Sequence, residues 1–142
     1  MTHFACALIV IASIAGFVNA CIFTGLIWGW LDPAEGPVAV VCRLDEGDCR
    51  KVTTSKNARL LGVPNSVLGA CWYVAAGLCG AAGVLTGSLP LREPLLIIST
   101  FTVALGVYLT WSLMFRLRVH CPFCYAGHLM NLVIFVAVAL SR

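Results

Sequence analysis

The chain has 142 residues, of which 61% are hydrophobic and 11% are charged, and its formal net charge is +3. Soluble domains are about 45–50% apolar and about 25% charged, so this composition, with a mean hydropathy of +0.97, excludes an ordinary water-soluble fold. Lys and Arg form no cluster, which argues against a nucleic-acid partner. Four helices of about 20 residues and one loop use the whole length, so we expect a single membrane domain over residues 1–142.

The first apolar segment covers residues 4–31 and predicts a transmembrane helix. Trp28 and Trp30 at its end suit the aromatic belt of a membrane surface. A signal peptide would have a basic start and a shorter apolar run, so this segment does not match one. Residues 18–21 faintly resemble a lipoprotein cleavage box, but the apolar sequence continues past them, which disfavours cleavage there. We assign Asn19, a polar residue inside this segment, to packing.

Residues 32–63 form the one long polar segment, in which five acidic and five basic side chains balance. It contains the first cysteine pair, Cys42 and Cys49. Residues 55–62 resemble a short helix with Ser55 at its N-cap and Gly62 just past its end. We therefore expect a loop that carries a short helix and lies over the bundle.

Three more apolar segments predict helices over residues 64–86, 94–115 and 121–140. Pro64 and Pro94 are well placed at first helical turns. The link between the second and third helices is too short for anything but a turn, so these helices should be antiparallel neighbours. The expected fold class is an all-α integral membrane protein with four helices in an up-down bundle.

A CxxC motif, Cys121 and Cys124, opens the last helix. Free backbone N–H groups and the helix dipole favour a thiolate there, and a thiolate is the attacking species in disulfide exchange. His128 and Asn131 follow Cys124 at four and seven residues, on the same helical face. Polar groups at membrane depth are costly when unpaired, so this stripe indicates a functional site.

Two transmembrane crossings separate the two cysteine pairs, so both pairs should lie on the same side of the membrane. Four thiols on one face suggest a protein that passes electron pairs between disulfides. Two alternatives remain: a metal-binding or metal-transport protein with Cys42, Cys49, Cys121 and Cys124 as thiolate ligands, and a bundle with structural disulfides. Covalent haem attachment needs His where Tyr125 stands. Four cysteines within apolar helices are assigned to packing: Cys6, Cys21, Cys71 and Cys79.

The order of these motifs resembles the vitamin K epoxide reductase (VKOR) family. The residues that carry the resemblance are Cys42 and Cys49, Ser55, Pro64-Asn65-Ser66 with Gly69, and Cys121-Pro122-Phe123-Cys124. The resemblance covers nearly the whole chain. Other bacterial quinone-linked thiol oxidases carry their CxxC motif in the first loop, so their motif order differs. Bacterial VKOR homologues often carry a fused thioredoxin-like domain. We expect none in this protein, and the resemblance then implies a separate thioredoxin-like disulfide carrier as partner.

The resemblance also implies an electron relay. Cys42 would exchange with the carrier, Cys49 would attack Cys121, and Cys124 would reduce a quinone of the ubiquinone, menaquinone or vitamin K type dissolved in membrane lipid. No metal is implied.

The implied quinone site consists of Asn65 and His128, which would hydrogen-bond the two carbonyls, and Ser55 would cap the loop helix. Animal members have tyrosine where His128 stands, so we favour simple quinones over an epoxide as acceptors.

Two arguments about membrane orientation disagree. Seven Lys and Arg residues lie on the cysteine side and two on the other, which by the positive-inside rule would place the thiols in the cytoplasm. Disulfides persist mainly in extracytoplasmic compartments, and the resemblance implies an active site on that side. Because equal numbers of acids and bases share the loop, we expect a bacterial inner-membrane protein with its thiols on the extracytoplasmic face.

Overall fold

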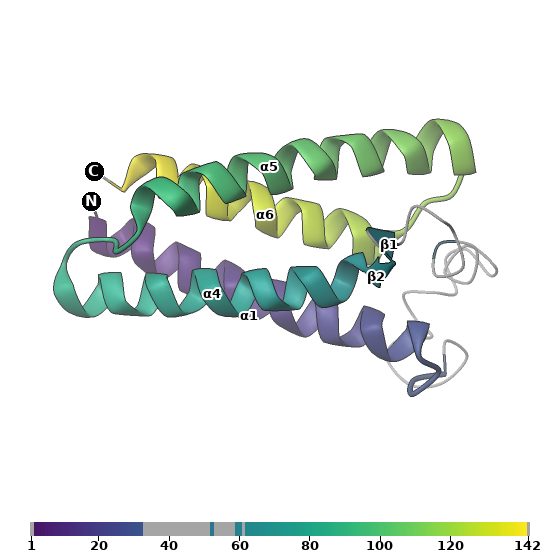
Figure 1. The fold of residues 1–142 in the computed structure, drawn as a ribbon, viewed down its shortest axis with the longest axis horizontal. Coiled ribbons are helices and arrows are strands. Elements are labelled where there is room, and N and C mark those ends of the chain that lie inside the picture. Colours follow the sequence, from purple (N-terminus) through teal and green to yellow (C-terminus); the bar gives the residue numbers. More distant parts are fainter. Residues whose placement is uncertain (1, 33–51, 53–58, 61, 142) are drawn as a thin grey trace.

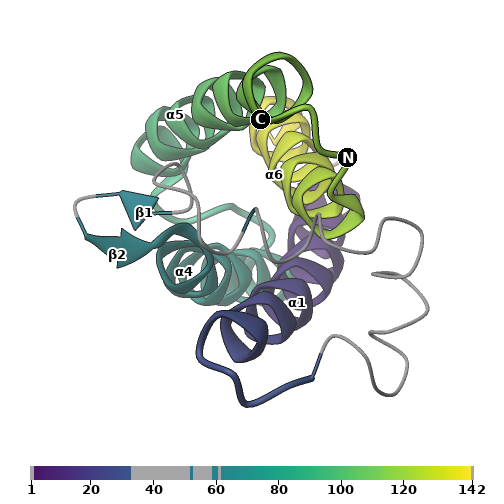
Figure 2. The same ribbon diagram turned by 90° about the vertical axis from the view of Figure 1, so that its right-hand side faces the viewer.

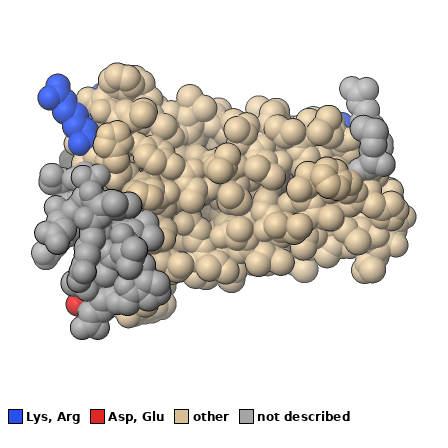
Figure 3. All heavy atoms as spheres, turned by 180° about the vertical axis from the view of Figure 1, so that it is seen from behind, with Lys and Arg blue, Asp and Glu red and all other residues tan. Residues whose placement is uncertain are grey.

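A computed structural model describes residues 2–32, 52, 59–60 and 62–141. Its long elements are α1 (Thr2–Ile27), α4 (Asn65–Thr86), α5 (Arg92–Trp111), which continues as the π-helix η3 (Ser112–Leu117), and α6 (Pro122–Leu140). Within these residues, four helices are long and apolar enough to cross a membrane, and α5 with η3 counts as one of them. The described charged residues lie near helix ends, and the long face in Figure 3 is free of them along its middle. The predicted all-α membrane bundle is confirmed.

The four helices alternate in direction along the bundle (Figure 1). The described chain starts and stops at one end, which we call the terminal end. At the opposite end, α1 and η3 stop and α4 and α6 begin; because Cys121 immediately precedes α6, we call it the cysteine end. Helix boundaries lie within a few residues of those predicted, since hydropathy and proline signals are local.

Three helix pairs pack extensively: α1 with α4, α1 with α6, and α5 with α6. The helices α4 and α5 are antiparallel, as predicted, but they make few contacts with each other. The end-on view shows α4 and α5 apart, with α1 and α6 connecting them around the bundle (Figure 2). Helices joined by a short turn therefore need not be the ones that pack.

Small residues explain the tight α1–α4 pair. A Cβ atom on Gly80 would lie 2.9 Å from Cγ2 of Ile9, and one on Gly83 would lie 2.6 Å from the Cys6 sulfur. In lipid, helices associate largely through close packing, which glycine allows because it has no side chain. The fully buried Ile9 and Ile134 belong to the main core, which joins α1, α4 and α6 and includes Leu95 of α5.

The expected helix over residues 55–62 is wrong where the structure describes it. Arg59–Leu60 form the short strand β1, which pairs antiparallel with β2, Val63–Pro64. Gly62 has φ +85° and occupies the second position of a two-residue turn. A residue before proline disfavours helical angles, so Val63 keeps the chain extended up to Pro64. Ser55, the expected cap, lies outside the described residues.

Candidate active site

The start of α6 brings two sulfurs together. Cys121 is the N-cap residue, with φ −113° and ψ 100°, and its sulfur accepts a hydrogen bond from the backbone N–H of Cys124 at 3.3 Å. The two sulfurs lie 2.6 Å apart, with the Cys124 thiol directed at Cys121. Pro122 occupies the first turn, where its fixed φ suits the helix and its missing N–H costs nothing. The pair therefore sits where helix-end N–H groups can stabilise sulfur charge.

The two cysteines face different surroundings. Cys121 is only 1% exposed and packs in a small cluster with Val52 of the loop, Leu113 and Val119. Cys124 lines a cavity among the helices. One sulfur thus packs beside Val52 and the other opens into the bundle.

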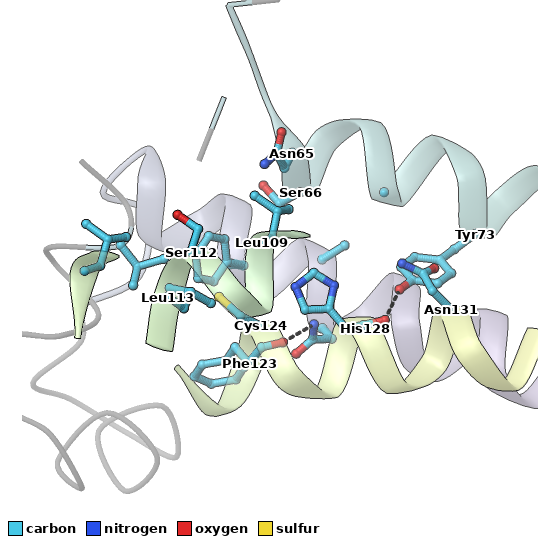
Figure 4. A pocket seen from close by; sticks show the side chains of 17 residues that line it. Asn65, Ser66, Tyr73, Leu109, Ser112, Leu113, Phe123, Cys124, His128 and Asn131 are labelled. Atoms are coloured by element: carbon cyan, nitrogen blue, oxygen red, sulfur yellow. Dashed lines mark hydrogen bonds between the residues drawn. The ribbon is translucent and has the colours of Figure 1, made fainter. Parts of the chain in front are cut away.

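The cavity has a volume of about 150 Å³ and lies at the cysteine end, between helices contributed by all four spans. Figure 4 shows the Cys124 sulfur and the His128 ring rising from α6 toward the first turn of α4, where Asn65 and Ser66 lie. Most of the cavity surface is apolar, and the apolar side chains that contribute to it are Ala20, Phe23, Val52, Leu109, Leu113, Leu117 and Phe123. The structure therefore brings Asn65, Cys124 and His128 to one apolar cavity.

His128 is fitted closely against α5. A Cβ atom added to Gly106 would lie 2.9 Å from Nδ1 of His128 and 3.3 Å from its Cγ. Only glycine at this position lets the imidazole occupy its present place beside the helix. The residue that sets the position of His128 on this side is therefore Gly106, which the sequence does not single out.

Asn131 lies about one helical turn beyond His128 and also lines the cavity. Its Oδ1 atom is buried and has no hydrogen-bond partner among the described residues. Leaving such an atom unsatisfied costs about 1–3 kcal/mol. This atom accepts hydrogen bonds, so it fits a mostly apolar ligand that carries a donor group, as the hydroxyl of a quinol does.

Two further residues at the site were missed or misassigned from the sequence. Asn19, assigned to packing, lines the cavity and donates from Nδ2 to the carbonyl of Phe123 at 3.0 Å. Tyr73 also lines the cavity and donates from its hydroxyl to the carbonyl of Gly127 at 3.0 Å. The cost of an amide at membrane depth was a usable signal for Asn19. For Tyr73 only its spacing of eight residues from Asn65 hinted at a shared helical face.

The loop cysteines Cys42 and Cys49 lie outside the described residues, so their roles stay predictions. Among the residues that the structure covers, no three His, Cys, Asp or Glu side chains gather as a metal site. The metal alternative needs both loop cysteines and therefore remains untested.

A cysteine pair beside an apolar cavity in a four-helix membrane bundle defines the class of integral membrane thiol oxidoreductases. The family model described as the Vitamin K epoxide reductase family matches residues 7–139. The chain belongs to this family, whose members are membrane redox enzymes associated with quinones. A search of curated proteins found no significant match.

Proposed function

We propose that the protein is a membrane thiol:quinone oxidoreductase. It takes two electrons and two protons from the dithiol of a separate thioredoxin-like carrier and delivers them to a quinone, leaving a disulfide in the carrier and quinol in the bilayer. The observation that carries the proposal is the division at the start of α6: Cys124 shares an apolar cavity with Asn65 and His128, while Cys121 packs against the loop residue Val52.

The relay uses two disulfide exchanges. A carrier thiolate attacks Cys42 of the Cys42–Cys49 disulfide, and the second carrier thiol releases the carrier as a disulfide. Cys49, now a thiolate, attacks Cys121 of the Cys121–Cys124 disulfide and releases Cys124 as a thiolate; attack by Cys42 on Cys49 then frees Cys121. Val52 follows Cys49 by three residues, which span at most about 11 Å, so the tether to the Cys121 cluster is short enough for this exchange.

The cavity residues serve the acceptor. The quinone, when bound, supplies the site that takes up the electron pair. The Asn65 amide and the His128 ring lie on different helices of one cavity and can hydrogen-bond its two carbonyls. Donors placed at these oxygens stabilise the negative charge that develops there during reduction.

The test uses the full chain in lipid nanodiscs with a reduced thioredoxin-like carrier and a short-chain ubiquinone, with quinol followed by absorbance. Cys124→Ala should abolish quinol formation with the carrier and with a small membrane-permeant dithiol, because Cys121 then has no partner with which to form the disulfide that Cys49 attacks. Cys42→Ala should lose turnover with the carrier but keep it with a small membrane-permeant dithiol. Equal inactivity of both variants with the dithiol would contradict the order of the relay. Stoichiometric bound metal without quinol formation would favour the metal alternative.

We also propose that the cysteine end faces the extracytoplasmic side of a bacterial inner membrane. Two substitutions in a cysteine-free background decide this: Asp32→Cys at the cysteine end and Ser88→Cys at the terminal end, both at exposed positions. A membrane-impermeant maleimide on intact cells should label the first and not the second. The reverse pattern would establish the inverted orientation.

A further inference from the structure

We propose that Asn19 and Tyr73 are positioning residues that set the depth and rotation of α6, and through it the places of Cys124 and His128 in the cavity. The inference rests on the proposed function, because it concerns the same site. It assigns to these residues a role in quinone reduction without contact with the reacting atoms.

Cys124 and His128 are each preceded by a residue whose carbonyl accepts a hydrogen bond from another helix. Asn19, from α1, donates to the carbonyl of Phe123, the residue immediately before Cys124. Tyr73, from α4, donates to the carbonyl of Gly127, immediately before His128. Both distances are 3.0 Å, and the dashed lines in Figure 4 mark both bonds. Each of the two α6 side chains that would act in the cavity, Cys124 and His128, is therefore held through the peptide that precedes it.

Both hydrogen bonds depend on glycines, because a side chain at these positions would crowd the Asn19 or Tyr73 side chain that donates. A Cβ atom on Gly16 would overlap the ring of Tyr73, which is 4% exposed. A Cβ atom on Gly127 would lie 3.3 Å from Nδ2 of Asn19 and 3.9 Å from the Tyr73 hydroxyl. The close approach of α1 and α4 to α6 at this level therefore accommodates the two donors specifically.

Satisfying the backbone does not explain these bonds. The carbonyls of Phe123 and Gly127 lie within α6, where the N–H four residues later is the regular partner. The side-chain bonds are additional, and each links α6 to a different neighbouring helix. Interhelical hydrogen bonds of this kind contribute little to stability in membranes, whereas a misplacement of about 1 Å at reacting groups can cost about a hundredfold in rate. The main effect of the two hydrogen bonds should therefore be on the positions of Cys124 and His128 and less on stability.

The test compares two conservative substitutions with a control substitution. All three remove a side-chain hydrogen bond from a neighbouring helix to a carbonyl of α6 or of the residue that follows it. Tyr73→Phe removes only the hydroxyl, and Asn19→Leu replaces the amide by an apolar side chain of similar size. Arg92→Met is the control, because Arg92 donates from Nε to the carbonyl of Ser141 at 2.6 Å, just past the other end of α6. Thermal stability and the kcat and KM for a short-chain ubiquinone are measured in nanodiscs.

We expect kcat to fall about tenfold in each single variant and further in the double variant, with KM changed less than threefold. Arg92→Met should keep kcat, whatever its melting temperature. A kcat within twofold of wild type in the double variant, or an equal fall in Arg92→Met, would overturn the proposal.

A second readout does not require turnover. In a Cys121→Ala background, the rate of Cys124 alkylation by N-ethylmaleimide reports how this sulfur is presented to the cavity. The rate should change severalfold with Asn19→Leu and stay constant with Arg92→Met, and an unchanged rate with Asn19→Leu would contradict the positioning role. If the wild type formed no quinol, the proposed function would fail while this assay still decided the role of Asn19.

Discussion

The two ends of the bundle are built by different means. At the terminal end, α4 presents Gly80 and Gly83 to α1 so closely that no side chain fits at either position. Arg92 joins α5 to the end of α6 through the Ser141 carbonyl, and to Glu93 beside it. Close packing thus fixes α4 against α1 at this end, where a groove of about 470 Å³ with an apolar lining also lies between α1 and α6.

At the cysteine end the helices enclose a cavity, and polar side chains connect them. Asn19 and Tyr73 bind carbonyls of α6, and Thr24 of α1 donates to the Ser66 hydroxyl of α4 at 2.9 Å. A cavity forgoes the van der Waals contacts that its lining would otherwise make. The comparison indicates that the glycine contact of α4 with α1 stabilises the terminal end, whereas the cysteine end keeps a cavity with polar lining residues between helices held at defined distances by hydrogen bonds.

The largest effect that separates the two ends should come from Gly80→Val. The new side chain would start 2.9 Å from Cγ2 of Ile9 and 3.2 Å from the Cys6 carbonyl, so the helices must move apart. Overpacking of this kind costs about 1–3 kcal/mol. We expect a lower melting temperature in lipid, measured by thermal denaturation, with kcat per folded molecule retained.

Ala81→Val is the matched control, because Ala81 is exposed on the outer surface of the same helix and a branched side chain there meets no neighbouring helix. It should leave the melting temperature within a few degrees of wild type. If Gly80→Val lowered kcat as strongly as stability, the separation between a structural end and a functional end would be wrong.

The glycines also show what the sequence could predict. Hydropathy, proline at helix starts and the CxxC motif are local signals, and they placed the four helices and the sulfur pair. Which helices pack together depends on how Gly80 and Gly83 meet residues more than 70 positions away, so α4 and α5 were expected as close neighbours and are not.

The same limit applies to the site. Helical periodicity put His128 and Asn131 on the face of Cys124, and the resemblance to the VKOR family suggested Asn65. The contacts of Tyr73 and Gly106 with α6 join helices far apart in sequence, and no local pattern distinguishes them from ordinary core residues.

A smaller effect, confined to the cysteine end, should follow from Gly106→Ala. The added methyl group would lie 2.9 Å from Nδ1 of His128, so the imidazole must shift into the cavity. We expect kcat/KM for the quinone to fall about tenfold, which corresponds to about 1.4 kcal/mol, while stability changes little because alanine is the better helix former.

A double-mutant cycle with His128→Ala checks the cause. Removing the imidazole removes the ring atoms that the methyl group would displace, so Gly106→Ala should have little further effect in that background. Additive losses in the double variant would show that Gly106 acts through another part of the cavity.

The smallest effect, and the one most specific to a ligand site, should come from Asn131→Leu. Oδ1 of Asn131 is buried without a hydrogen-bond partner among the described residues, so an apolar side chain of similar shape removes a penalty and should raise the free energy of unfolding by about 1 kcal/mol. If the amide serves the ligand, quinone turnover should fall severalfold in the same variant. Thermal denaturation in nanodiscs without quinone measures the first change, and steady-state quinol formation measures the second.

Ser13→Ala is the control, because its Oγ is likewise buried and unpartnered within the described part of the chain but does not line the cavity. It should gain stability and keep full turnover. If Asn131→Leu behaved in the same way as Ser13→Ala, the amide would be a packing defect and the ligand would be bound by other residues of the cavity.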